Sequence, residues 1–129
     1  MIFRVLVPLV VLLALVLVGC RGNPVYDVAN MPVTTSTRGY SLGDVRGAIL
    51  RAGAAQGWRM KIVRPGLIIG TLYLRSHMAQ VEIPYDRVTY SILYRDSNNL
   101  DYDGVNIHSN YNAWVQRLSA EINAQLSAL

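Results

Sequence analysis

The sequence predicts an α+β domain, in which an antiparallel four-stranded meander sheet carries an N-terminal and a C-terminal helix on one face (α-β-β-β-β-α). Two segments, 41–57 and 109–128, have apolar residues at helical spacing. Between them lie four short segments of strand character, and their short connections favour antiparallel pairing. Both helices can then bury their apolar stripes on one face of the sheet. A chain of 129 residues has room for one small domain.

Residues 1–19 are typical of a lipoprotein signal peptide. Arg4 precedes an uncharged apolar run from Val5 to Val18, which is shorter than the about 20 residues of a membrane span. The run ends in Leu17-Val18-Gly19-Cys20, which resembles the lipobox of bacterial lipoproteins. That resemblance implies that the cysteine is acylated and becomes the mature N-terminus. Cys20, the single cysteine of the chain, is therefore the expected lipidation site.

Residues 20–40 are expected to form the acylated cysteine and a flexible tether, followed by a single α+β domain over 41–129. Two prolines, two asparagines and a Thr/Ser run interrupt any periodicity in the tether. Arg21 follows the cysteine, whereas the sorting rule of bacterial lipoproteins places an aspartate there for retention in the inner membrane. The expected location is therefore the bacterial cell envelope, in the inner leaflet of the outer membrane and facing the periplasm.

The first helix is expected to begin after Ser41. Ser41 is a good N-cap, and Asp44 stands three residues later, as in a capping box with Asp in place of Glu. Gly57 is the expected residue after the helix end. The apolar face consists of Val45, Ala48, Ile49, Ala52 and Ala55.

The four expected strands are Trp58–Arg64, Leu67–Arg75, Ala79–Tyr85 and Arg87–Arg95. In the first, alternation places Arg59 and Lys61 on the face opposite Trp58, Met60 and Ile62. The second is mostly apolar, which predicts a central strand buried on much of both faces. In the fourth, alternation predicts one shared face for Val88, Tyr90, Ile92 and Tyr94.

The second helix is expected to begin at Ser109 or Asn110 and to reach about Ala128. Its apolar stripe is expected to pack on the sheet. The polar segment 96–106 before it is expected to contain Asx-turns that close the connection from strand to helix. The stripe consists of Tyr111, Val115, Leu118, Ile122, Leu126 and Leu129, widened by Trp114.

The second half of the chain resembles a family of small uncharacterised proteobacterial lipoproteins. The resemblance is carried by Ala79–Tyr85, Tyr90–Tyr94 and the pattern Ile107-His108-x-x-Tyr111-Asn112-x-Trp114, together with Gly57-Trp58 and Pro65-Gly66. It covers most of residues 41–126. It implies an envelope lipoprotein with a single domain, and it carries no activity and no catalytic residue.

A cluster around the last loop, consisting of Asp96, Ser97, His108, Tyr111 and Asn112, is the candidate site. One hypothesis is a structural lock, in which His108 makes hydrogen bonds across the loop and fixes the helix to the sheet edge. The other is an exposed recognition site, because loops often carry specificity.

Two alternative functions remain open at this cluster. An envelope hydrolase would combine Ser97 and His108 with Asp96 or Asp101, although no G-x-S-x-G motif is present. A small-ligand or calcium-binding module would use the acidic loop, although an EF-hand register starting at Asp96 fails at Leu100. Two histidines 31 positions apart give no metal-ligand spacing, and neither a metal nor a cofactor is expected.

The charge is unevenly placed along the chain. Residues 38–75 hold seven cations and one acid, whereas residues 76–129 hold three cations and six acids. Arg59 and Lys61 are therefore a candidate anion-facing patch. The predicted function is a non-enzymatic binding or structural role of a lipid-anchored envelope protein. Its expected partners are the membrane, through lipid on Cys20, and an envelope protein or polymer, with no nucleic acid.

Overall fold

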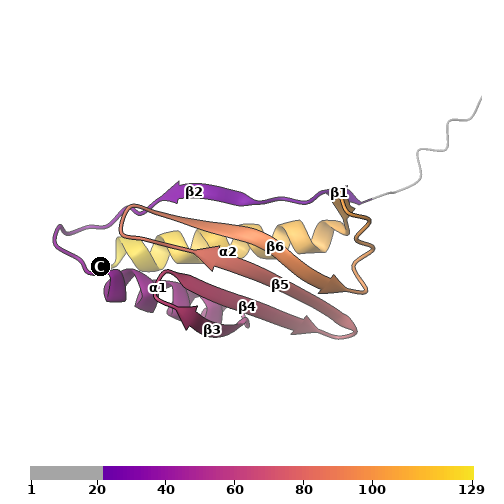
Figure 1. Cartoon of the computed structure of the whole chain (residues 1–129), viewed down its shortest axis with the longest axis horizontal. Helices are drawn as coiled ribbons and strands as arrows, with labels where there is room; N and C mark the ends of the chain where they lie inside the picture. The colour runs from indigo at the N-terminus through magenta and orange to yellow at the C-terminus, as the bar shows by residue number, and fades with distance from the viewer. Residues whose placement is uncertain (1–21) are drawn as a thin grey trace, which may run out of the picture.

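The computed structural model describes residues 22–129, so the expected signal peptide and Cys20 lie outside the described residues. The molecule has two layers, with an antiparallel sheet in front and both helices behind it (Figure 1). The α+β class is therefore confirmed. Neither helix within 22–129 has the length and hydrophobicity of a membrane span.

Helix α1 (Leu42–Ala55) begins at the predicted N-cap. The Ser41 hydroxyl accepts from the Asp44 backbone N–H at 3.0 Å, and the Asp44 carboxylate accepts from the Ser41 N–H at 2.8 Å. The predicted capping box is thus confirmed. Gly57 follows the helix with a φ of 80°, a conformation that favours glycine.

The main sheet has five strands in the order β2-β6-β5-β4-β3, and all neighbours are antiparallel. The four strands of the predicted meander are present with small changes at their ends. The fifth strand, β2, was not predicted. The bounds are β2 (Val28–Pro32), β3 (Arg59–Arg64), β4 (Leu67–Leu74), β5 (His77–Pro84) and β6 (Thr89–Asn98).

Part of the expected flexible tether belongs to the fold, which corrects the four-stranded prediction. β2 pairs with β6, and β1 (Asn23–Pro24) pairs with β7 (Asn106–Ile107) in a separate two-stranded sheet. β2 shows no alternation of hydrophobicity because it is an edge strand with one buried side chain, that of Val28. An edge strand also tolerates Pro32. The fold therefore begins well before residue 41.

The helices cover only one face of the sheet. That face carries the buried cross-strand pairs Ile68↔Ile83 and Leu72↔Ala79. The other face is open, so the expectation that the second predicted strand is buried on much of both faces was wrong. Tyr73 in β4, for example, is 60% exposed. Val88 is also outside the predicted shared face, because β6 begins after it and its side chain is exposed.

Helix α2 (Ser109–Ser127) packs its predicted stripe into the core. Its N-cap is His108, one residue before the predicted cap. The Tyr90 hydroxyl from β6 contacts α2 through the Ser119 hydroxyl at 2.8 Å and the Asn123 side-chain oxygen at 2.7 Å. These bonds fix the helix against the sheet.

Candidate functional site

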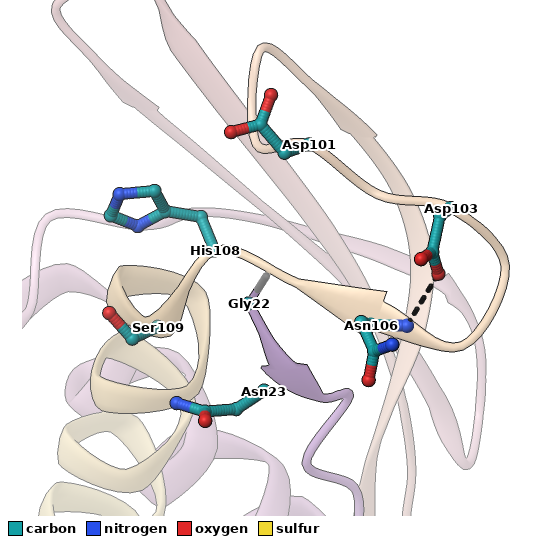
Figure 2. A pocket seen from close by; sticks show the side chains of 7 residues that line it. All are labelled: Gly22, Asn23, Asp101, Asp103, Asn106, His108 and Ser109. Atoms are coloured by element: carbon teal, nitrogen blue, oxygen red, sulfur yellow. Dashed lines mark hydrogen bonds between the residues drawn. The ribbon is translucent and has the colours of Figure 1, made fainter. Parts of the chain in front are cut away.

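A polar pocket of about 550 Å³ lies at the end of the molecule where β1, β7 and the start of α2 meet (Figure 2). Its walls come from three places: the first described residues, the loop after β6, and the start of α2. Among the residues of the predicted cluster, His108 alone lines it. The lining residues are Gly22, Asn23, Asp101, Asp103, Asn106, His108 and Ser109.

His108 holds the start of α2. Its Nδ1 accepts a hydrogen bond from the Asn110 backbone N–H at 3.1 Å. Its own backbone N–H donates to the Leu100 carbonyl at 2.8 Å, across the loop. These are the contacts that the structural-lock hypothesis requires. Because Nδ1 is an acceptor here, the proton of the neutral imidazole lies on Nε2.

The acidic loop is closed by an Asx-turn. One oxygen of the Asp103 carboxylate accepts from the backbone N–H groups of Val105 at 2.9 Å and Asn106 at 2.7 Å. These bonds, that from Asn106 first, lower the pKa of Asp103 below its ordinary value. No group of three or more His, Cys, Asp or Glu side chains in residues 22–129 is arranged to hold a metal ion.

The other members of the predicted cluster do not meet at this pocket. Asp96 and Ser97 line a second hollow of about 670 Å³ beside the loop. The Ser97 hydroxyl is hydrogen-bonded to the Tyr94 hydroxyl at 2.8 Å. Among the hydrogen bonds of the described residues, none joins Ser97 to His108. The arrangement of a serine nucleophile beside a histidine base is therefore not formed in this structure.

Tyr111 and Asn112 have different structural uses. Tyr111 is fully buried and lies edge-on to Tyr94, with ring centroids 5.7 Å apart. Burial raises the pKa of Tyr111 well above its ordinary value, and the neighbouring Asp27 adds to the shift. Asn112 donates to the Pro24 carbonyl and accepts from the Tyr26 N–H, both at 2.9 Å. It therefore clamps the segment between β1 and β2 to helix α2.

The open face of the sheet carries the predicted basic patch. Arg59 and Lys61 project from β3 in register with Thr71 and Ile69 of β4, and both side chains are exposed. The Arg59 guanidinium lies 5.3 Å from the centre of the Tyr73 ring, a cation–π distance. The predicted placement of this pair away from the helices is confirmed.

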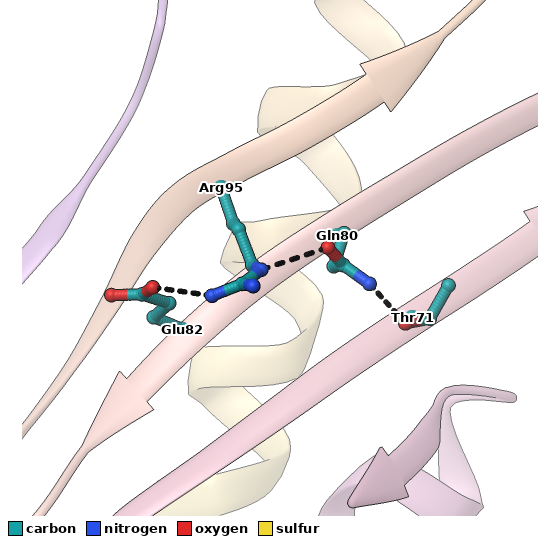
Figure 3. A network of polar contacts seen from close by, with 4 residues as sticks. All are labelled: Thr71, Gln80, Glu82 and Arg95. Carbon is teal, nitrogen blue, oxygen red and sulfur yellow. Dashed lines mark hydrogen bonds and ion pairs between the residues drawn. The ribbon is translucent and has the colours of Figure 1, made fainter.

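A polar network crosses the middle of the same face (Figure 3). The Gln80 amide donates to the Thr71 hydroxyl at 3.1 Å and accepts from Arg95 at 3.0 Å. Arg95 also forms an ion pair with Glu82 at 2.7 Å. This is the one ion pair found within residues 22–129, so Arg59 and Lys61 have no carboxylate partner there.

The sequence did not reveal the role of Gly22. A Cβ at this position would lie 1.9 Å from the Ile107 carbonyl oxygen, so only glycine fits against β7. Comparison with family models, with curated proteins and with solved structures found no match to this chain. The function is therefore inferred from the residues and contacts of the chain itself.

Proposed function

We propose that this protein is a lipid-anchored lipoprotein of the bacterial envelope, acylated at Cys20, which faces the periplasm from the outer membrane and has a non-enzymatic binding role. The observation that carries the proposal is the position of the lipobox-like segment 17–20. It ends two residues before Gly22, where the fold begins. An apolar run followed at once by a cysteine and a folded domain is the organisation that lipid anchoring needs.

The contacts around the last loop favour binding over catalysis. The polar groups that a hydrolase would use are occupied in structural bonds: Ser97 with Tyr94, and His108 with the start of α2. The open face of the sheet instead presents two cations without carboxylate partners, Arg59 and Lys61. Such a face suits an envelope protein or polymer that carries negative charge.

The anchor is tested by the mass and location of the mature protein. The wild type should fractionate with membranes and carry lipid mass on Cys20, whereas Cys20→Ala should keep its signal peptide and carry no lipid. Arg21→Ala is the matched control, and it should be processed like the wild type. Normal maturation and lipid labelling of Cys20→Ala would overturn the proposal.

The partner is tested through Lys61, the single lysine of the chain. In intact envelopes, a carbodiimide joins amines to carboxylates at direct contact, so an acidic partner on this face should be crosslinked through Lys61. Lys61→Arg keeps the charge but removes the reactive amine, and it should lose that crosslinked species. An identical crosslinking pattern in the two proteins would show that the partner does not contact this face.

A further inference from the structure

The chain is fixed to the domain from its first described residue. Gly22 lies against the Ile107 carbonyl with no room for a side chain. β1 and β7 then pair through Asn23↔Ile107 and Pro24↔Asn106, and the Val25 N–H donates to the Val105 carbonyl at 3.0 Å. The clamp from Asn112 follows directly. The point where the chain enters the fold is therefore set by backbone pairing and by close packing.

The covalent chain limits how far a lipid on Cys20 can lie from this point. Cys20 precedes Gly22 by two residues, and two residues of fully extended chain reach at most about 7 Å. The expected flexible tether of 20 residues is thus reduced to this short connection, because β1 and β2 belong to the fold. The end of the molecule that holds β1 must then lie beside the anchored lipid.

This end exposes apolar and aromatic side chains. Val105, in the turn before β7, is 67% exposed, and Tyr102 is 41% exposed. In Figure 1, β1 lies at one end of the long axis, and the turn between β5 and β6 lies at the other end, near the C-terminus. That distant turn carries Val88, which is 71% exposed. The two ends thus provide matched exposed valines.

We propose that the end formed by β1, β7 and loop 99–106 rests on the headgroup layer of the membrane, with Val105 and Tyr102 at the interface. This inference rests on the proposed lipid anchor. Tyrosine is favoured at such an interface because one end of its side chain is apolar and the other is polar. The carboxylates of Asp101 and Asp103 at this end favour the ammonium groups of zwitterionic lipids over a purely anionic surface.

The orientation has a consequence for the basic patch. The open face of the sheet runs along the long axis of the molecule (Figure 1). With the β1 end on the membrane, Arg59 and Lys61 face sideways into the periplasm and not toward the lipid. The patch then remains free for a partner beside the protein.

The test uses the full-length acylated protein in phosphatidylethanolamine–phosphatidylcholine vesicles. The only native cysteine carries lipid, so Val105→Cys and Val88→Cys each provide one free thiol for a fluorophore. A spin label on the lipid headgroup should quench emission at position 105 several-fold more strongly than at position 88. Both substitutions are at exposed sites, so both variants should fold.

A longer connection provides the control. Insertion of about 15 Gly/Ser residues between Arg21 and Gly22 adds roughly 20 Å of flexible reach, so the difference in quenching should shrink while the lipid remains. Equal quenching at the two positions in protein that carries lipid would overturn the orientation alone. Protein without lipid mass on Cys20 would overturn both the anchor and the orientation.

Discussion

His108 separates a structural from a recognition role at a single residue. Its Nδ1 caps helix α2 through the Asn110 N–H. We expect His108→Ala to lower the free energy of unfolding by about 1 kcal/mol, as the loss of an N-cap does. His108→Ser, which restores a cap acceptor, should recover most of that loss. Urea unfolding of the soluble domain measures both changes.

The serine variant also tests recognition, because it lacks the imidazole but keeps the cap. If His108 acts only on the helix, His108→Ser should give the wild-type crosslinks in intact envelopes. If it also contacts a partner, the same variant should be stable and lose them. Unchanged stability of His108→Ala would contradict the cap itself.

Asn112 makes the corresponding prediction for the N-terminal segment. Its side chain makes two hydrogen bonds to backbone groups between β1 and β2, to Pro24 and Tyr26. Asn112→Ala should destabilise the domain by about 1–2 kcal/mol and speed amide exchange at Tyr26, because each lost bond contributes about 1 kcal/mol. Gln116→Ala, at an exposed position of the same helix, is the control. Unchanged exchange at Tyr26 in Asn112→Ala would show that the clamp is dispensable.

The start of helix α1 links an element to pH. The Ser41 backbone N–H, and then its hydroxyl, hold the pKa of Asp44 below its ordinary value of 3.8. A lowered folded-state pKa gives stability that is fully present above the unfolded value and is lost as pH falls through the folded value. Asp44→Asn should therefore be less stable than the wild type at neutral pH, and the gap should close on acidification below about 3.8. Thermal unfolding at a series of pH values measures it, and a gap that stays constant in acid would contradict it.

The predicted and the unpredicted elements differ in where their stabilisation comes from. Helices α1 and α2 and strands β3 to β6 bury regular apolar faces, so periodicity locates them. β2 has one buried residue and is held by backbone pairing and by bonds such as that from the Asn30 N–H to the Ser91 hydroxyl at 2.9 Å. Such contacts depend on the partner strand, and the local sequence cannot show them. The same holds for β1 and β7.

The candidate cluster was only partly predictable for the same reason. Sequence proximity placed His108, Tyr111 and Asn112 together, but successive helical residues point in different directions. Tyr111 therefore enters the core, and Asn112 reaches the segment after β1. The faces of Arg59 and Lys61 were predictable because a strand has a strict period of two.

At the scale of the whole molecule, the two faces of the sheet have different chemistry. One is covered by both helices, and the other is open along its length (Figure 1). On the open face, Arg95 is neutralised by Glu82, whereas Arg59 and Lys61 at the β3 side are not paired with a carboxylate of the described chain. The open face therefore presents net positive charge at that side.

This charge predicts salt-sensitive binding to an anionic surface. The soluble domain, without its lipid, should bind anionic vesicles at low salt and lose them steeply as salt rises, because exposed charges are screened within about 10 Å at 0.1 M salt. The double variant Arg59→Glu/Lys61→Glu should abolish binding and leave unfolding unchanged, since both side chains are exposed. The control, Arg38→Glu/Arg117→Glu, makes the same change in net charge at exposed sites off the sheet and should keep binding. Equal loss in the two double variants would mean that net charge alone, and not the β3 patch, drives the association.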